Sequence, residues 1–150
     1  MRTHIDRLVR RRHRGRSGRF PGILPPVHYY EAFSDLAGVY LEDSWVLEVA
    51  PSDHGLSFRL ETVLTPEHPL YTPPEPGKQH CYRLAWLSVG GEAPTDIRLK
   101  GSRPAIDATG EPDYGHVDSF AFNSTENRWE LEGDWGFASV CAPKVTLGFD

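Results

Sequence analysis

The stretch from Glu111 to Ala142 constrains the fold more than any other part of the chain. Within it, Trp129-Glu130-Leu131-Glu132 alternates apolar with charged residues, which is the two-residue period of a strand with one face in water. Gly133-Asp134 follows and suits a tight two-residue turn, because glycine tolerates positive φ at the first position. Trp135 to Cys141 then forms the returning strand. The stretch therefore predicts an antiparallel meander.

The register of this hairpin follows from its turn. A turn at Gly133-Asp134 places Leu131 opposite Gly136 and Trp129 opposite Ala138, so that a large side chain faces a small one in both pairs. A single strand bent by a glycine bulge is the alternative.

Proline and glycine are distributed along the whole chain. The 150 residues include 13 prolines and 14 glycines, which argues against a helical bundle and for many short elements joined by turns. One domain of this length has enough volume for a core. No apolar run approaches the roughly 20 residues of a membrane helix, so we expect a soluble protein without a membrane partner.

Further elements are expected from the periodicity. One helix is expected over residues 28–36, where Tyr29, Phe33 and Leu36 share a face and Gly38 forms the C-terminal cap. Expected strands are residues 39–50, 56–64, 80–89, 96–100, 116–122 and 143–149, and Gly90-Gly91 is expected to form a turn. Strand 80–89 is apolar on both sides, which predicts a central strand buried on both faces.

Residues 65–79 contain five prolines and predict a loop. This loop is either a rigid connection that covers a sheet edge or a docking segment for an aromatic groove. These elements together predict a mainly β domain over residues 27–150. We expect an antiparallel curved sheet, or a partly open barrel or sandwich, of six to eight strands with one short N-terminal helix.

The net charge of −5 is unevenly distributed. Residues 1–20 carry eight arginines and one acid, a net charge of +7, whereas residues 21–150 carry eight basic and twenty acidic residues, a net charge of −12. Eight like charges with few apolar residues predict that residues 1–26 form a disordered basic tail and a proline-rich linker. This tail is the one part of the chain suited to nucleic acid, through phosphate contacts. An organelle transit peptide, a segment that folds back on the acidic domain, and a translation start nearer Leu24 or Val27 are the alternatives.

The two cysteines, Cys81 and Cys141, both lie in apolar strands. This placement predicts buried free thiols in a reducing compartment, and therefore a cytoplasmic protein; a single disulfide between the two is the alternative. No GxGxxG, P-loop, HExxH, CxxC or GxSxG motif is present, so the sequence predicts no cofactor and no metal, and a function other than catalysis.

His116 and Asp118 form the first candidate site. Strand alternation places them on the face that carries Phe120 and Phe122, and ligands at i and i+2 suit a metal on a β scaffold. Further ligands would have to come from His54, His68 or His80, which nothing in the sequence brings close. The alternative is that His116 lies outside the strand and that Asp118 is solvated.

Asp43 is the second candidate, because it interrupts an apolar stripe of the same parity that runs from Val39 to Val49. In a continuous strand, its carboxylate would lie in an apolar setting that raises the pKa and favours a general base. Alternatively, Glu42-Asp43-Ser44 forms a turn or a bulge.

The third candidate is a surface. Residues 111–134 contain seven acids and one base, and Trp135 follows them directly. Acidic charge steers basic partners, and tryptophan anchors many interfaces. We therefore expect a non-enzymatic acidic binding module for a basic protein, of the immunity or accessory type, in which Glu130, Glu132 and Asp134 steer and Trp135 anchors. The alternative is a small-ligand-binding or hydrolase-like barrel pocket that uses Asp43, or His116 with Asp118.

Overall fold

A computed structural model of the chain describes residues 27–100, 105–106 and 112–150. The expected basic tail and linker, residues 1–26, lie outside the described residues. No helix in the described part of the chain has the length and apolarity needed to span a bilayer.

Six strands form one antiparallel sheet in the order β1-β2-β3-β8-β7-β6. Their bounds are Val39–Ser52 (β1), Gly55–Leu64 (β2), Cys81–Leu99 (β3), Ser119–Asn123 (β6), Arg128–Gly133 (β7) and Gly136–Phe149 (β8). Ala105–Ile106 (β4) and Pro112–Asp113 (β5) pair separately as a two-stranded sheet. The prediction of a mainly β, antiparallel domain is confirmed.

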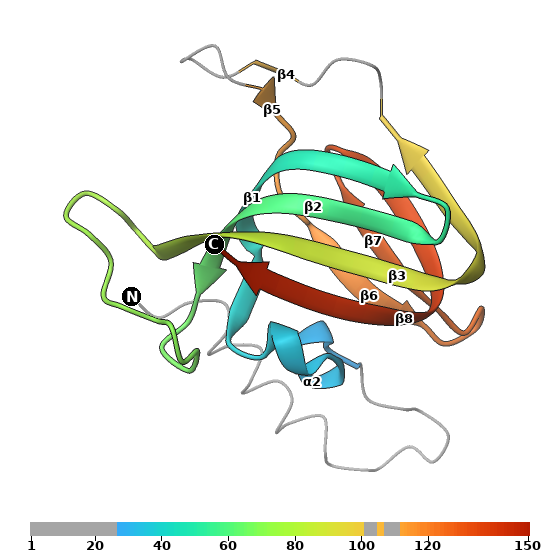
Figure 1. Cartoon of the computed structure of the whole chain (residues 1–150), viewed down its shortest axis with the longest axis horizontal. Coiled ribbons are helices and arrows are strands. Elements are labelled where there is room, and N and C mark those ends of the chain that lie inside the picture. Colours follow the sequence, from blue (N-terminus) through green and yellow to red (C-terminus); the bar gives the residue numbers. More distant parts are fainter. Residues whose placement is uncertain (1–26, 101–104, 107–111) are drawn as a thin grey trace.

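The large sheet curves strongly but does not close. In Figure 1, β6 and β7 lie behind the part formed by β1, β2, β3 and β8, so the sheet has an inner and an outer face. An isolated bridge between Trp45 and His116, and a 2.8 Å hydrogen bond from the Val46 N–H to the Gly115 carbonyl, tie β1 to the segment that leads into β6.

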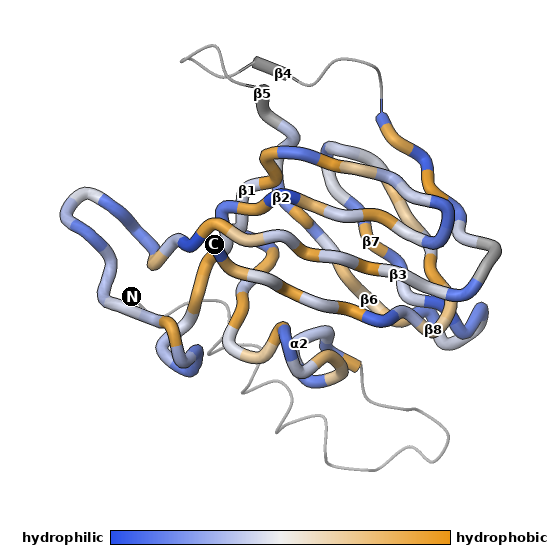
Figure 2. The backbone as a smooth tube through the Cα atoms, viewed as in Figure 1, coloured by the Kyte–Doolittle hydropathy of each residue, from blue (hydrophilic) through white to orange (hydrophobic). Residues whose placement is uncertain are grey.

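The core fills the inside of this curve, and β2 shows how the sequence pattern builds it. Leu56, Phe58, Leu60, Thr62 and Leu64 are buried, whereas Ser57, Arg59 and Glu61 are half-buried on the outer face. Figure 2 shows the same alternation of apolar and polar positions along the β2 tube. The half-buried strand expected over residues 56–64 is therefore confirmed.

Strands β3 and β8 are longer than expected. Gly90-Gly91 is not a turn: the chain bends here but continues as one 19-residue strand, with register shifts against β8 on either side of Glu92. β8 likewise continues through Ala142, which adopts a positive φ of 45°. The expected turn was wrong because β3 and β8 bend at the same place. The hydrogen bonds between the two strands therefore continue on both sides of the glycines and keep the chain extended there.

The β7–β8 hairpin forms, but its turn is Asp134-Trp135 instead of Gly133-Asp134. Gly133 pairs with Gly136, so Leu131 faces Ala138 and Trp129 faces Val140. The expected register was therefore wrong by two residues, which leaves the paired side chains of both strands on their expected faces. The cause is tertiary: a Cβ at position 133 would lie 2.2 Å from the His116 carbonyl oxygen and 2.5 Å from the Trp135 Nε1, so this glycine permits close packing below the turn.

The expected helix is two short turns, α2 (Tyr29–Ala32) and a 3-10 turn, η1 (Ser34–Leu36), with Phe33 extended between them at φ −121°. Its apolar residues nevertheless contact the sheet. The Phe33 ring lies 4.8 Å from Trp129 and 5.4 Å from Phe120, centroid to centroid. Tertiary packing at one end of the curved sheet therefore determines this segment more than helix propensity does.

The proline-rich loop, residues 65–79, lies against the start of β3. The Thr72 N–H donates to the Cys81 Sγ at 3.5 Å, and the His68 ring lies 5.3 Å from the Phe149 ring. Cys81 is buried and Cys141 half-buried, and both are free thiols.

Candidate interaction surface

Trp135 does not lie on the surface. Its side chain is 3% exposed and contacts Phe58 edge to face at 4.8 Å between centroids. The indole Nε1 is buried without a hydrogen-bond partner among the described residues. The expectation of an exposed anchor at Trp135 is therefore corrected, because the two-residue turn directs the indole into the core.

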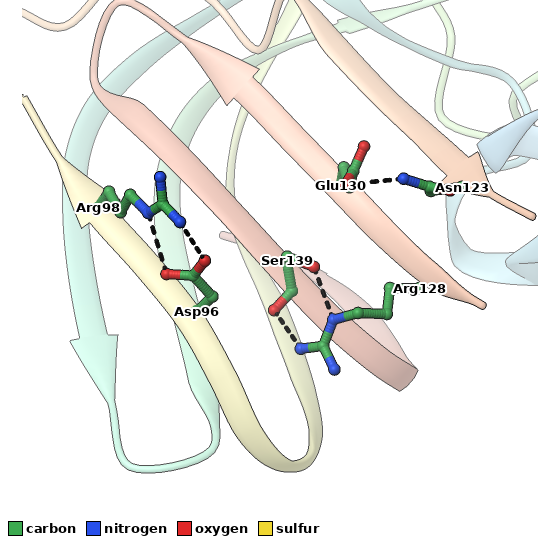
Figure 3. A network of polar contacts seen from close by, with 6 residues as sticks. All are labelled: Asp96, Arg98, Asn123, Arg128, Glu130 and Ser139. Atoms are coloured by element: carbon green, nitrogen blue, oxygen red, sulfur yellow. Dashed lines mark hydrogen bonds and ion pairs between the residues drawn. The ribbon is translucent and has the colours of Figure 1, made fainter. Parts of the chain in front are cut away.

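The three acids expected to steer a partner do lie outside the core. Glu132 and Asp134 are exposed and Glu130 is half-buried. Figure 3 shows Glu130 and its neighbours: Asn123 Nδ2 donates to Glu130 Oε2 at 3.2 Å, and Arg128, also on β7, donates to the Ser139 hydroxyl through Nε at 2.7 Å. Cations on this face offset part of its negative charge.

Arg98 supplies a second cation on this outer face. Its guanidinium bonds Asp96 at 2.9 Å and lies 5.8 Å from the centre of the Phe137 ring (Figure 3). The face outside β7 and β8 is thus a mixed-charge surface with little exposed aromatic area.

His116 and Asp118 do not form a site together. His116 lies before β6, where its ring contacts the Trp45 ring at 4.1 Å between centroids, whereas Asp118 is exposed. Val117 and Phe120 are both buried, so alternation breaks over residues 117–119 and Asp118 does not share the face of Phe120. No group of three or more His, Cys, Asp or Glu side chains in the described residues could hold a metal ion.

Asp43 lies in a bulge, one of the two arrangements expected for it. Four residues of β1, from Leu41 to Ser44, stand where β2 has only Thr62, because the register shifts between Tyr40 and Trp45. The bulge places the Asp43 carboxylate on the outer face, 3.0 Å from His80 Nε2. The sequence did not indicate this partner, because 37 residues separate the two side chains and only the sheet register joins them.

The bulge is held by Ser44, which is fully buried. Its hydroxyl donates to the Tyr40 carbonyl at 2.7 Å and accepts from the Val63 N–H at 2.9 Å. Burial, followed by the nearby carboxylates of Asp43 and Glu42, raises the pKa of Tyr40 to about 12. The negative charges of the bulge thus act on the Tyr40 phenol.

The exposed aromatic residues lie on the other side of the molecule from β7. Four large apolar side chains of β1 and β3 are 39–43% exposed, and we call this group the Trp face: Trp45, Leu47, Leu84 and Trp86. In Figure 1 the outer face of β1, β2 and β3 is turned to the viewer, and neither α2 nor η1 covers it. The expectation that residues 80–89 are buried on both faces is thus wrong for the outer face, although β3 is central in the sheet.

Strand register places charged residues between these apolar ones. Glu61 of β2 pairs with Trp45 on one side and with Leu84 on the other. In the next row, Arg59 lies between Glu48 and Trp86. The Trp face is therefore a three-strand patch with carboxylates among its aromatic residues.

The one cation in these two rows is already engaged. The Arg59 guanidinium lies 5.6 Å from the centre of the Trp86 ring and forms a bidentate pair with Asp150, with Nη1 at 2.7 Å from Oδ1. This pair lowers the pKa of the Asp150 carboxyl. The carboxylates of Glu48 and Glu61 remain on the patch, and the bulge places Asp43 close by.

The signal for this surface is present in the sequence. Leu84 and Trp86 alternate with the buried Ala85 and Leu87, so an outward apolar row was visible in residues 80–89. Whether a second layer covers such a row is a tertiary property, and here no described element does.

The fold and this surface together define an open, curved antiparallel β-sheet protein with a tryptophan-bearing face that no described element covers. No family model matches the chain, and no curated protein and no solved structure matches it either.

Proposed function

We propose that the protein is a non-enzymatic binding module that recognises a basic protein through the Trp face. The observation that carries the proposal is the set of four large apolar side chains, each 39–43% exposed, on the outer surface of β1 and β3. Exposed large apolar side chains gathered on one face of a domain are characteristic of interaction sites, and tryptophan is enriched among residues that dominate binding energy.

The charges on this face support a basic partner. Glu61 lies between Trp45 and Leu84, and Glu48 lies next to Arg59, which Asp150 already binds. A docked partner with lysine or arginine at the matching positions would pair these carboxylates, whereas an acidic partner would leave them desolvated and opposed by like charge. The described domain is also acidic overall, which favours encounter with basic proteins.

The test is affinity capture from a cell extract with the full chain and two variants matched in exposure. Leu84→Arg introduces a charge into the centre of the Trp face, and Leu99→Arg introduces the same charge at an equally exposed leucine outside it, since these residues are 43% and 44% exposed. We expect a basic protein that binds the wild type and Leu99→Arg but not Leu84→Arg. The loss at a central position corresponds to about 2 kcal/mol or more, roughly thirtyfold in Kd.

Two outcomes would reject the proposal. One is equal capture by Leu84→Arg and Leu99→Arg, and the other is a Leu84-dependent partner that is acidic.

Two charge-reversed variants separate contact from steering. Reversing Glu48 and Glu61 should raise the dissociation rate, because both side chains lie within the docked area. Reversing the charges of Glu130, Glu132 and Asp134 should slow association at low salt, because these acids contribute to the long-range field of the protein. It should leave the dissociation rate unchanged, because β7 lies behind β1, β2 and β3, away from the docked area (Figure 1). A faster dissociation in the second variant and not in the first would transfer the binding site to β7.

A further inference from the structure

A hollow lies where the proline-rich loop meets the start of β3, directly beside the Trp face. It has a cavity volume of about 180 Å³ and is lined by loop residues, including Pro74, Glu75 and Lys78, and by Glu61 and Tyr82 of the sheet. Because Glu61 is also the residue between Trp45 and Leu84, the hollow opens at the rim of the proposed docking surface.

One wall of the hollow is rigid. The His80 side chain is only 9% exposed, and its Nε2 lies 3.0 Å from Asp43 Oδ2 in the β1 bulge. The His80 ring also packs edge to face on the Tyr82 ring at 5.8 Å between centroids. Burial raises the pKa of Tyr82 and outweighs a hydrogen bond from Trp45 that lowers it, and the negative charges of Glu61 and Asp43 raise it further.

The chain places a cation of its own in this hollow. The ammonium group of Lys78 lies over the Tyr82 ring, 6.0 Å from its centre. An aromatic ring attracts a cation electrostatically at this distance, and the attraction strengthens where water is excluded. Lys78 belongs to an exposed part of the loop, so its side chain can leave without disturbing the sheet.

We propose that this hollow receives a lysine or arginine side chain of the partner, which takes the place of Lys78 over Tyr82. This inference rests on the proposed function, since it assigns a specific pocket to the basic partner. Glu61 and Glu75 supply the carboxylates that pair with the incoming cation, and Tyr82 supplies the ring face. Lys78 then acts as an internal competitor that lowers the affinity for the partner until it is displaced.

The test uses small probes with the full chain, so that it does not depend on capture of the partner. We would titrate acetyl-arginine amide, acetyl-lysine amide and the neutral acetyl-glutamine amide, following backbone amide resonances by NMR. We expect both cationic probes to shift the resonances of Thr72, Lys78, His80 and Tyr82, and the neutral probe to leave them in place.

Two variants should change the affinity for the cationic probes in opposite directions. Lys78→Ala removes the competitor and should tighten binding by about two- to fivefold, whereas Glu61→Gln should weaken it by a similar factor. A general loss of structure cannot tighten binding, so the Lys78→Ala result is specific. Equal shifts with the neutral probe, no shift in the pocket with any probe, or weaker binding by Lys78→Ala would each overturn the inference.

The two proposals fail separately. The probes are titrated with the wild-type chain and capture is tested with Leu84→Arg, so each proposal has its own readout. Probe binding without any Leu84-dependent partner would reject the proposed function alone, and Leu84-dependent capture without probe binding would reject the pocket alone.

Discussion

The bend in β3 gives the sharpest test of how the curved sheet is built, through alanine at two adjacent glycines. A Cβ added at Gly91 would lie 2.2 Å from Val140 Cγ1 and 2.8 Å from the carbonyl oxygen of Cys141 in β8. A Cβ added at Gly90 would meet no atom within 4 Å. Gly91→Ala and Gly90→Ala therefore make the same chemical change at neighbouring positions, one crowded and one open.

The size of the difference follows from these distances. Carbon atoms in contact are normally about 3.5–4.0 Å apart, so Gly91→Ala requires β3 and β8 to separate or Val140 to leave its rotamer. Overpacking of this kind costs about 1–3 kcal/mol and occasionally more. Gly90→Ala restricts only the unfolded chain and should be neutral or stabilise by up to about 1 kcal/mol.

Urea unfolding followed by tryptophan fluorescence gives the free energy of unfolding of both variants, and thermal unfolding gives their Tm. We expect Gly91→Ala to lower the free energy of unfolding and to lower Tm by roughly 2–12 °C, with the denaturant slope unchanged if the native state stays compact. Equal stability of the two variants would refute the argument that the close approach at Gly91 permits the bend.

Two further predictions concern the β1 bulge. Ser44→Ala removes a buried hydroxyl that donates to the Tyr40 carbonyl and accepts from the Val63 N–H. It should lower the free energy of unfolding in urea by about 1–3 kcal/mol. Ser57→Ala, at a half-buried serine, is the control, and an equal loss in both variants would show that the bulge does not depend on the Ser44 hydroxyl. The pKa of Tyr40 in the folded protein is raised to about 12, so the unfolded chain loses this proton at lower pH than the folded protein does. The neutral phenol therefore contributes its full stability below about pH 10, and this contribution declines as pH rises from about 10 to 12. Tyr40→Phe should therefore flatten the alkaline decline of the free energy of unfolding by at most roughly 2–3 kcal/mol, and an unchanged slope would contradict the assigned shift.

The sequence alone determined the fold class and most of the strands. Period-two alternation in residues 56–64 and 129–132 is a local property that any sheet with one wet face must satisfy, so it predicted β2 and β7 correctly. Local chemistry also explains the turn between β6 and β7, because Asn123 Oδ1 accepts hydrogen bonds from the N–H groups of Thr125 and Glu126.

Tertiary structure decided the bends, the turn register and the location of the candidate site. Gly90-Gly91 is typical of a turn, yet pairing with β8 keeps the chain extended there. Trp135 follows an acidic stretch, yet packing against Phe58 brings it inside. Asp43 and His80 are distant in sequence, and only the register of β1, β2 and β3 brings them together. Local patterns report what one strand prefers, whereas exposure and proximity depend on which elements cover a face, and that depends on the whole chain.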